Sequence, residues 1–176
     1  MRLEEADIAE KRVFIRADLN VPMLDGQISN DARIRASLPT ISKVLEKNCA
    51  VTVLSHLGRP EEGKFDEAFS LAPIAQRLSE LLSVPVILLK DIEQSKALSK
   101  GQIGLMENVR FFAGEKGNSD ELGRRMAACC DVFIMDAFGS AHRAHASTNS
   151  IAKHVEVVLP GFLMESELKA LNGVVQ

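Results

Sequence analysis

Short apolar runs that alternate with longer amphipathic stretches constrain the fold of this chain more than any other feature. The runs with strand character span 12–17, 50–55, 85–89, 102–107, 131–136 and 155–160. Helical patterns lie between and after them, at 32–47, 71–82, 91–99, 119–130, 148–154 and 164–173. Strands of continuous apolar character occur in parallel sheets that helices cover on both faces. We therefore predict an α/β domain with a doubly wound, mainly parallel sheet of about six strands.

Individual residues mark the ends of several of these elements. Asn30 or Asp31 is available to cap the helix over 32–47, and Pro39 is expected to bend or restart it. Ser70 is expected to cap the helix over 71–82, whose apolar face consists of Leu71, Ile74, Ala75, Leu78, Leu81 and Leu82. The stretch before this cap carries Gly, Pro and charge without a period and is predicted as a loop. The resulting order of strands and helices is that of a Rossmann-like fold.

The amino-acid composition limits the kinds of partner that the protein is expected to bind. The length of 176 residues fits one domain, and a content of 46% hydrophobic residues is enough for an ordinary core. The formal net charge of -3 and the absence of Tyr and Trp argue against a nucleic-acid partner. A charged N-terminus and short apolar runs predict neither a signal peptide nor a membrane span. We expect a cytoplasmic monomer without nucleic-acid or membrane partners.

The cysteines do not form a recognisable metal or disulfide framework. Cys49 stands alone, Cys129 and Cys130 are adjacent, and no C-x-x-C spacing occurs. We predict that they are small buried hydrophobic residues of a protein in a reducing compartment.

Polar side chains follow the predicted strands at their carboxyl ends, which is where open parallel sheets bind ligands. The run 12–17 and its continuation supply Arg16, Asp18 and Asn20, and the helix over 32–47 opens with Arg33. The later strands are followed by His56, Arg59, Arg110, His142 and Arg143. The order of the strands in the sheet cannot be read from the sequence.

The basic members of this set number seven, in a chain with an acidic balance. A single arginine after a strand is usually a solvated loop residue, but a cluster of cations is costly unless an anion completes it. Arginine suits this task because its planar fork donates two hydrogen bonds to a phosphate or carboxylate. Asp18 and Asn20 supply acceptors, which suits a ligand that also carries a hydroxyl group. The residues therefore favour a small phosphorylated hydroxy acid.

The stretch "AHRAHAST" also raises the possibility of a metal site, because His142 and His145 are three residues apart. Two histidines without a cysteine or a nearby acid are short of ligands, and Arg143 would place a cation beside the metal. We therefore predict no metal site here. A metal-dependent hydrolase that uses these histidines is the weakest hypothesis, and we expect His145 to be a packed or capping residue.

Five motifs together resemble phosphoglycerate kinase in its N-terminal half: "RADLNVP", "DARIRASLPTI", "SHLGRP", "ENVRF" and "GSAHRAHAST". The resemblance runs from about residue 11 to the end of the chain and implies a substrate, 3-phosphoglycerate or 1,3-bisphosphoglycerate. It implies that the substrate is bound by Arg16, Asp18, Asn20, Arg33, His56, Arg59, Arg110, His142 and Arg143. It also implies that Arg33 has a catalytic role, close to the transferred phosphoryl group.

The resemblance further implies a second domain that is not in this chain. In the family, a C-terminal domain binds Mg-ATP, and neither G-x-x-x-x-G-K-[ST] nor G-x-G-x-x-G occurs here. We therefore expect residues 1–176 to be a single substrate-binding domain, the N-terminal half of a two-domain kinase that is inactive without its own C-terminal domain. We expect no cofactor in this chain. The alternative is a stand-alone module that binds a phosphorylated metabolite.

Overall fold

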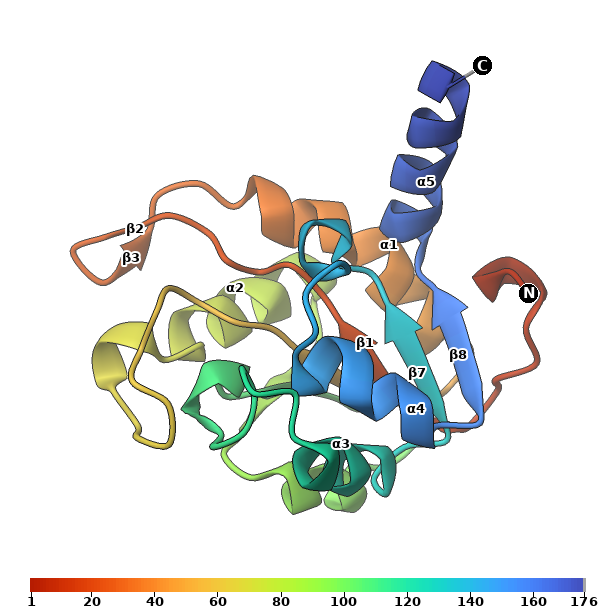
Figure 1. Cartoon of the computed structure of the whole chain (residues 1–176). Helices are drawn as coiled ribbons and strands as arrows, with labels where there is room; N and C mark the ends of the chain where they lie inside the picture. Colours follow the sequence, from red (N-terminus) through yellow and green to blue (C-terminus); the bar gives the residue numbers. More distant parts are fainter. Residues whose placement is uncertain (176) are drawn as a thin grey trace.

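The centre of the molecule is a parallel sheet of six strands, shown by the computed structural model, which describes residues 1–175 (Figure 1). Its strand order is β5-β6-β4-β1-β7-β8. The bounds are β1 Arg12–Arg16, β4 Ala50–Leu54, β5 Val86–Leu89, β6 Ile103–Met106, β7 Val132–Met135 and β8 Val157–Pro160. Every apolar run of the sequence forms one of these strands, so the predicted doubly wound α/β fold is confirmed.

Helices cover both faces of the sheet. On one face lie α1 (Ala32–Glu46) and α2 (Ala72–Leu82), whose apolar residues share one core cluster with Val13 and Ile15 of β1. On the other face lie α3 (Asp120–Ala127), α4 (Ile151–His154) and a 3-10 segment over Ile92–Ala97, which pack with Phe14. Successive side chains of a strand point to opposite faces, so β1 anchors both cores.

The long helix α1 departs from one prediction, because it runs unbroken through Pro39. A proline inside a helix removes one backbone hydrogen bond. Here Ile34, Ile41 and Val44 are all fully buried, and their packing holds the helix across that defect. The N-cap position is Asp31, whose side chain makes no capping hydrogen bond, and Asn30 just before it accepts from the backbone N–H of Ala32 at 2.8 Å.

Smaller differences concern local structure that the sequence pattern did not resolve. The turn at Asp25 and Gly26 joins a short hairpin, β2 (Met23–Leu24) and β3 (Gln27–Ile28), which was not predicted. Both turn residues have positive φ, as tight hairpins with two-residue loops require. The predicted helix over 91–99 is a 3-10 segment, and the weak helix near 148–154 is one π-helical turn over Ala146–Ser150 followed by α4.

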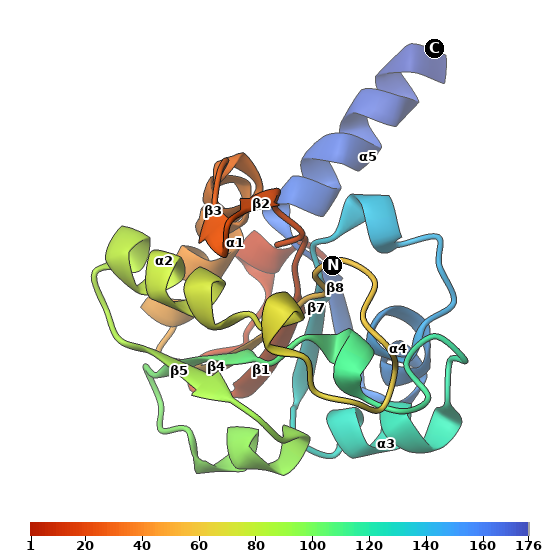
Figure 2. The same cartoon turned by 90° about the vertical axis from the view of Figure 1, so that its left-hand side faces the viewer.

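The last helix, α5 (Phe162–Val175), begins at the sheet and extends away from the body of the molecule (Figures 1 and 2). Its first turn is held by Asp136, whose Oδ1 accepts from the backbone N–H groups of Leu163 and Met164. No helix among residues 1–175 is both long and apolar enough to cross a membrane.

The sheet topology has a switch point between β1 and β7, where a doubly wound fold is expected to form a crevice. The chain leaves β1 through α1 and reaches β4 on one side, and it leaves β7 for β8 on the other side. The two connections diverge, and ligands of doubly wound proteins bind where they do so, at the carboxyl ends of the strands. The predicted site residues follow β1, β4, β6 and β7, so the fold brings them to this edge.

Candidate anion-binding site

Arg16, the last residue of β1, lies at the centre of the site. Its side chain is 1% exposed, and each of its nitrogens makes a hydrogen bond. Nε donates to Ser147 Oγ at 3.0 Å, Nη1 donates to the carbonyl of Ala17 at 2.6 Å, and Nη2 donates to His56 Nδ1 at 3.0 Å. Burial lowers the pKa of Arg16 to about 10, so the guanidinium remains charged at neutral pH.

His56 follows β4 and is a neutral partner of this arginine. Because an arginine can only donate, Nδ1 of His56 must accept, and the ring proton is therefore on Nε2. Burial and the charges of Arg16 and Arg110 lower the pKa of His56 to about 3. His56 therefore offers an N–H donor to the site but no charge.

Arg110 follows β6 and has an unsatisfied donor. It lies in a 3-10 turn over Val109–Phe111, and its Nη1 donates to the carbonyl of Gly58. Its Nε is buried and has no hydrogen-bond partner among the described residues. Burial, followed by the charge of Arg143, lowers the pKa of Arg110. A buried N–H without a partner is costly, and an anion in the crevice would satisfy it.

The loop after β7 brings further basic groups to the cluster. Arg143 is exposed, and its charge contributes to the lowered pKa of Arg16, His56, Arg110 and His145. His145 itself is half-buried, and burial is the main cause of its lowered pKa. His142 is exposed at the start of this loop, and no described contact links it to the cluster.

A second group of predicted residues forms a network beside Arg16. The guanidinium of Arg33, 54% exposed, donates to the carbonyl of Asn20 at 2.7 Å and lies 3.5 Å from Asp18. The side chain of Asn20 accepts from the backbone N–H of Gly58 at 3.0 Å, which ties the loop after β1 to the loop after β4. Arg59 is exposed on that second loop, and its charge contributes to the lowered pKa of Arg110.

Glu115 and Ser147 are site residues that the sequence analysis missed. The carboxylate of Glu115 is fully buried and accepts from the backbone N–H and the hydroxyl of Ser147, both at 2.7 Å. Glu115 stands in a charged loop, "AGEKGNS", away from the end of any strand, and its spacing has no pattern that distinguishes it from a solvated glutamate. Only the folded chain shows that it lies beside two buried arginines, Arg16 and Arg110.

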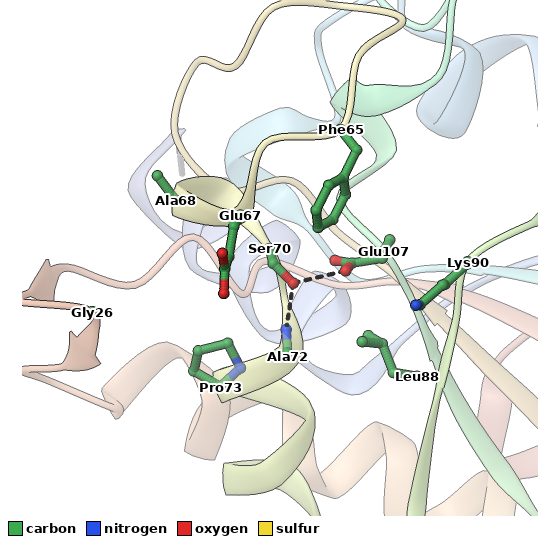
Figure 3. A pocket seen from close by; sticks show the side chains of 10 residues that line it. All are labelled: Gly26, Phe65, Glu67, Ala68, Ser70, Ala72, Pro73, Leu88, Lys90 and Glu107. Carbon is green, nitrogen blue, oxygen red and sulfur yellow. Dashed lines mark hydrogen bonds between the residues drawn. The ribbon is translucent and has the colours of Figure 1, made fainter.

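A large cavity of the molecule lies outside this cluster. Figure 3 shows a cavity of about 630 Å³ beside the start of α2, where Ser70 donates to Glu107. None of the nine predicted residues lines it, and both oxygens of Glu107 already accept hydrogen bonds. The cavity is an open surface groove, and its polar groups do not converge as those of the arginine cluster do. We therefore place the candidate site at the arginine cluster. No three His, Cys, Asp or Glu side chains of residues 1–175 gather as a metal ion would require.

The protonation state of His56 gives a testable consequence. The folded pKa is about 3 and that of the unfolded chain is near 6.5, so between these values the unfolded state binds more protons. The contribution of His56 to the free energy of unfolding therefore decreases as the pH falls from 6.5 toward 3. We expect the His56 ring to stay neutral, protonated at Nε2, in an NMR titration from pH 8 to 5. The urea-unfolded chain, as the control, should show a histidine titration near 6.5, and a folded-state midpoint above 6 would contradict this assignment.

Fold and candidate site together define the class of protein: a doubly wound α/β protein that gathers arginines at the carboxyl edge of its sheet. Comparison with known proteins specifies this further. The family model described as phosphoglycerate kinase matches residues 3–176. The chain belongs to the phosphoglycerate kinase family.

Individual relatives agree with this membership. The phosphoglycerate kinase of Desulfovibrio desulfuricans is 53% identical over 98% of this chain, and that of Legionella pneumophila is 49% identical over 100%. The solved structure of phosphoglycerate kinase from Coxiella burnetii has a TM-score of 0.94 at 50% identity over 98% of this chain. The enzyme from Pyrococcus horikoshii has a TM-score of 0.86 at 36% identity over 97%. The chain spans 44% of the length of each of these relatives.

Proposed function

We propose that residues 1–176 supply the 3-phosphoglycerate site of an enzyme that transfers a phosphoryl group between ATP and this substrate. The observation that carries the proposal is the cluster of Arg16, Arg110 and Arg143 with a buried Nε of Arg110 that has no hydrogen-bond partner among residues 1–175. A phosphate or carboxylate in the crevice would offset the mutual repulsion and accept from these donors. Asp18 and Asn20 would accept from the hydroxyl group of the same ligand.

The proposed substrate ligands are the nine residues of the sequence analysis, with unequal roles. Arg16 is so deeply buried that we assign it to the floor of the site, where its charge acts at short range. Arg59, His142 and Arg143 are exposed and would close on the ligand from the loops. Arg33, exposed beside Asp18, is the group we propose for the transferring phosphoryl.

The proposed phosphoryl transfer depends on the positioning of the reactants more than on proton transfer. A carboxylate is an adequate nucleophile at neutral pH, so the reaction needs no general base, and the barrier falls through alignment and neutralisation of charge. In this chain Gly58 to Lys64 have the spacing of a phosphate loop, but Phe65 stands where the pattern requires Ser or Thr. No α-helix starts there, because α2 begins only at Ala72. These residues do not fit a nucleotide site, and we assign Mg-ATP to a second domain of the enzyme.

The cysteines indicate the compartment in which the enzyme works. Cys49, Cys129 and Cys130 are free thiols, the first two of them buried. Free cysteines suit a reducing compartment, and we propose that the enzyme works in the cytoplasm.

Arg143→Ala and Arg59→Ala test the assignment of the loops. Each variant is expected to lose about 1.5–3 kcal/mol of 3-phosphoglycerate binding, the range for hydrogen bonds to charged groups. Calorimetric titration measures this, with Arg124→Ala as the control, because Arg124 is an exposed arginine of α3 paired with Asp120. The melting temperature should stay constant or rise, since repulsion among the cations is relieved. Unchanged affinity in both variants would remove these residues from the site.

A further inference from the structure

Glu115 is a buried carboxylate beside the arginine cluster, and the substrate chemistry proposed above does not use it. It comes from the loop between β6 and α3, and its side chain is fully buried. A buried carboxylate is unfavourable unless donors and a nearby cation compensate it. Glu115 has both, in the two donors from Ser147 and the charge of Arg16; burial raises its pKa, and these groups oppose that rise.

The hydrogen bonds around Glu115 form a directed chain. Arg16 Nε can only donate, so Ser147 Oγ accepts from it at 3.0 Å and donates its own hydroxyl hydrogen bond to Glu115 Oε2 at 2.7 Å. The other carboxylate oxygen accepts from the backbone N–H of Ser147. Both oxygens are acceptors, which is the pattern of an ionised carboxylate. Rotation of the Arg16 guanidinium would break this chain.

The same residue also fixes the loop that carries Arg143. The backbone carbonyl of Glu115 accepts from the N–H of Ala146 at 2.9 Å, so residues 146 and 147 are both attached to it. Thr148 Oγ1 then donates to the carbonyl of Arg143 at 2.6 Å. Glu115 thus connects three segments: its own loop after β6, Arg16 at the end of β1, and the loop over 143–148 that follows β7.

We propose that Glu115 is a positioning residue of the anion site, which acts through Ser147 to hold Arg16 and the Arg143 loop in a geometry ready for the ligand. This inference rests on the proposed function for the identity of the ligand. It makes a prediction opposite in sign to that of a simple charge effect. Removal of a negative charge near an anion site should tighten binding, whereas loss of a positioning residue should weaken it.

Glu107 provides a matched control. It is also a buried glutamate, and it also accepts from a serine hydroxyl and a backbone N–H, those of Ser70 and Leu71 at 2.7 and 2.8 Å. Its hydrogen bonds lead to the start of α2 and not to an arginine. Glu107→Gln should therefore reproduce the loss of stability caused by Glu115→Gln without its effect on the site.

The experiment compares the 176-residue chain with Glu115→Gln, Ser147→Ala, their double variant and Glu107→Gln. The first readout needs no ligand: the exchange of the Arg16 Nε–H proton with water, followed by NMR. We expect protection in the wild type and in Glu107→Gln, and faster exchange in the other three. The second readout is the affinity for 3-phosphoglycerate by calorimetry at pH 7.5. We expect Glu115→Gln and Ser147→Ala each to weaken it about tenfold or more, and the double variant to add little, because both act through one chain of bonds.

The outcomes separate the two proposals. If the wild type does not bind 3-phosphoglycerate, the proposed function fails, and the exchange of Arg16 Nε–H still decides whether Glu115 holds this arginine. Tighter binding in Glu115→Gln, or protection of Arg16 that persists in both single variants, would overturn the positioning role. Equal losses of affinity in Glu115→Gln and Glu107→Gln would also overturn it and reduce Glu115 to a residue of the core. If Glu115→Gln does not fold, Ser147→Ala decides alone, because it keeps the carboxylate.

Discussion

A polypeptide of residues 1–176 is expected to bind 3-phosphoglycerate and to show no measurable phosphoryl transfer from Mg-ATP. Two reactants must be held in line for the transfer, and we propose that the described residues supply a site for one of them. Alignment of reactants in a closed site can account for about 7–11 kcal/mol of a barrier, so its loss removes turnover altogether. This is the largest effect that the structure predicts.

The measurement is a coupled assay with Mg-ATP and 3-phosphoglycerate, run beside a calorimetric titration of the same preparation. Arg33→Ala serves as an internal check. Arg33 is exposed and contacts Asn20 and Asp18, so its removal should weaken binding only modestly and leave the rate at zero. Appreciable turnover by the wild-type polypeptide would show that a nucleotide site exists within these residues and that the division of labour proposed above is wrong.

Arg16→Met is expected to lower the free energy of unfolding by about 3–5 kcal/mol, because it leaves the buried carboxylate of Glu115 without the charge that Arg16 places near it across Ser147. Water cannot solvate the carboxylate that is left without its cation, because the side chain of Glu115 is 0% exposed. Methionine fills most of the space of arginine, so the loss reports the stranded carboxylate rather than a cavity. Urea denaturation at pH 7.5 measures it. Arg124→Met, which removes an exposed ion pair with Asp120, should cost less than about 1 kcal/mol.

The pH dependence of this loss identifies its cause. Burial raises the pKa of Glu115, and without the charge of Arg16 that pKa rises further. Below the raised pKa the folded variant holds a proton that the unfolded chain has released, so its stability increases as the pH falls through that pKa toward the unfolded value. The deficit of Arg16→Met should therefore shrink between pH 7.5 and 5. A deficit that is constant over this range would point to lost packing instead.

Some of the features behind these two predictions could be predicted from the sequence, and others could not. The six strands were readable because a doubly covered strand must be apolar on both sides, as "VFI" in β1 and "VFIM" in β7 are. The carboxyl edge of the sheet, where the candidate site lies, could also be predicted, because parallel strands all end on the same side of their sheet. Arg16, His56 and Arg110 were predicted by this rule, and the five motifs of the family led to the ligand that we propose.

Other features required the folded chain, because they arise from contacts between residues far apart in the sequence. The strand order puts β7 beside β1, and this neighbourhood brings Ser147 to Arg16 across 131 positions. In the sequence Glu115 resembles any glutamate of a charged loop, but the fold removes it from water. His56 resembles a titrating histidine, but burial and the arginines around it lower its pKa. The sequence by itself determined which residues lie at the carboxyl edge, because local periodicity encodes strands and their direction. Only the tertiary structure decided which of them are charged, buried or held in place, because desolvation and hydrogen bonding depend on the neighbours that the fold provides.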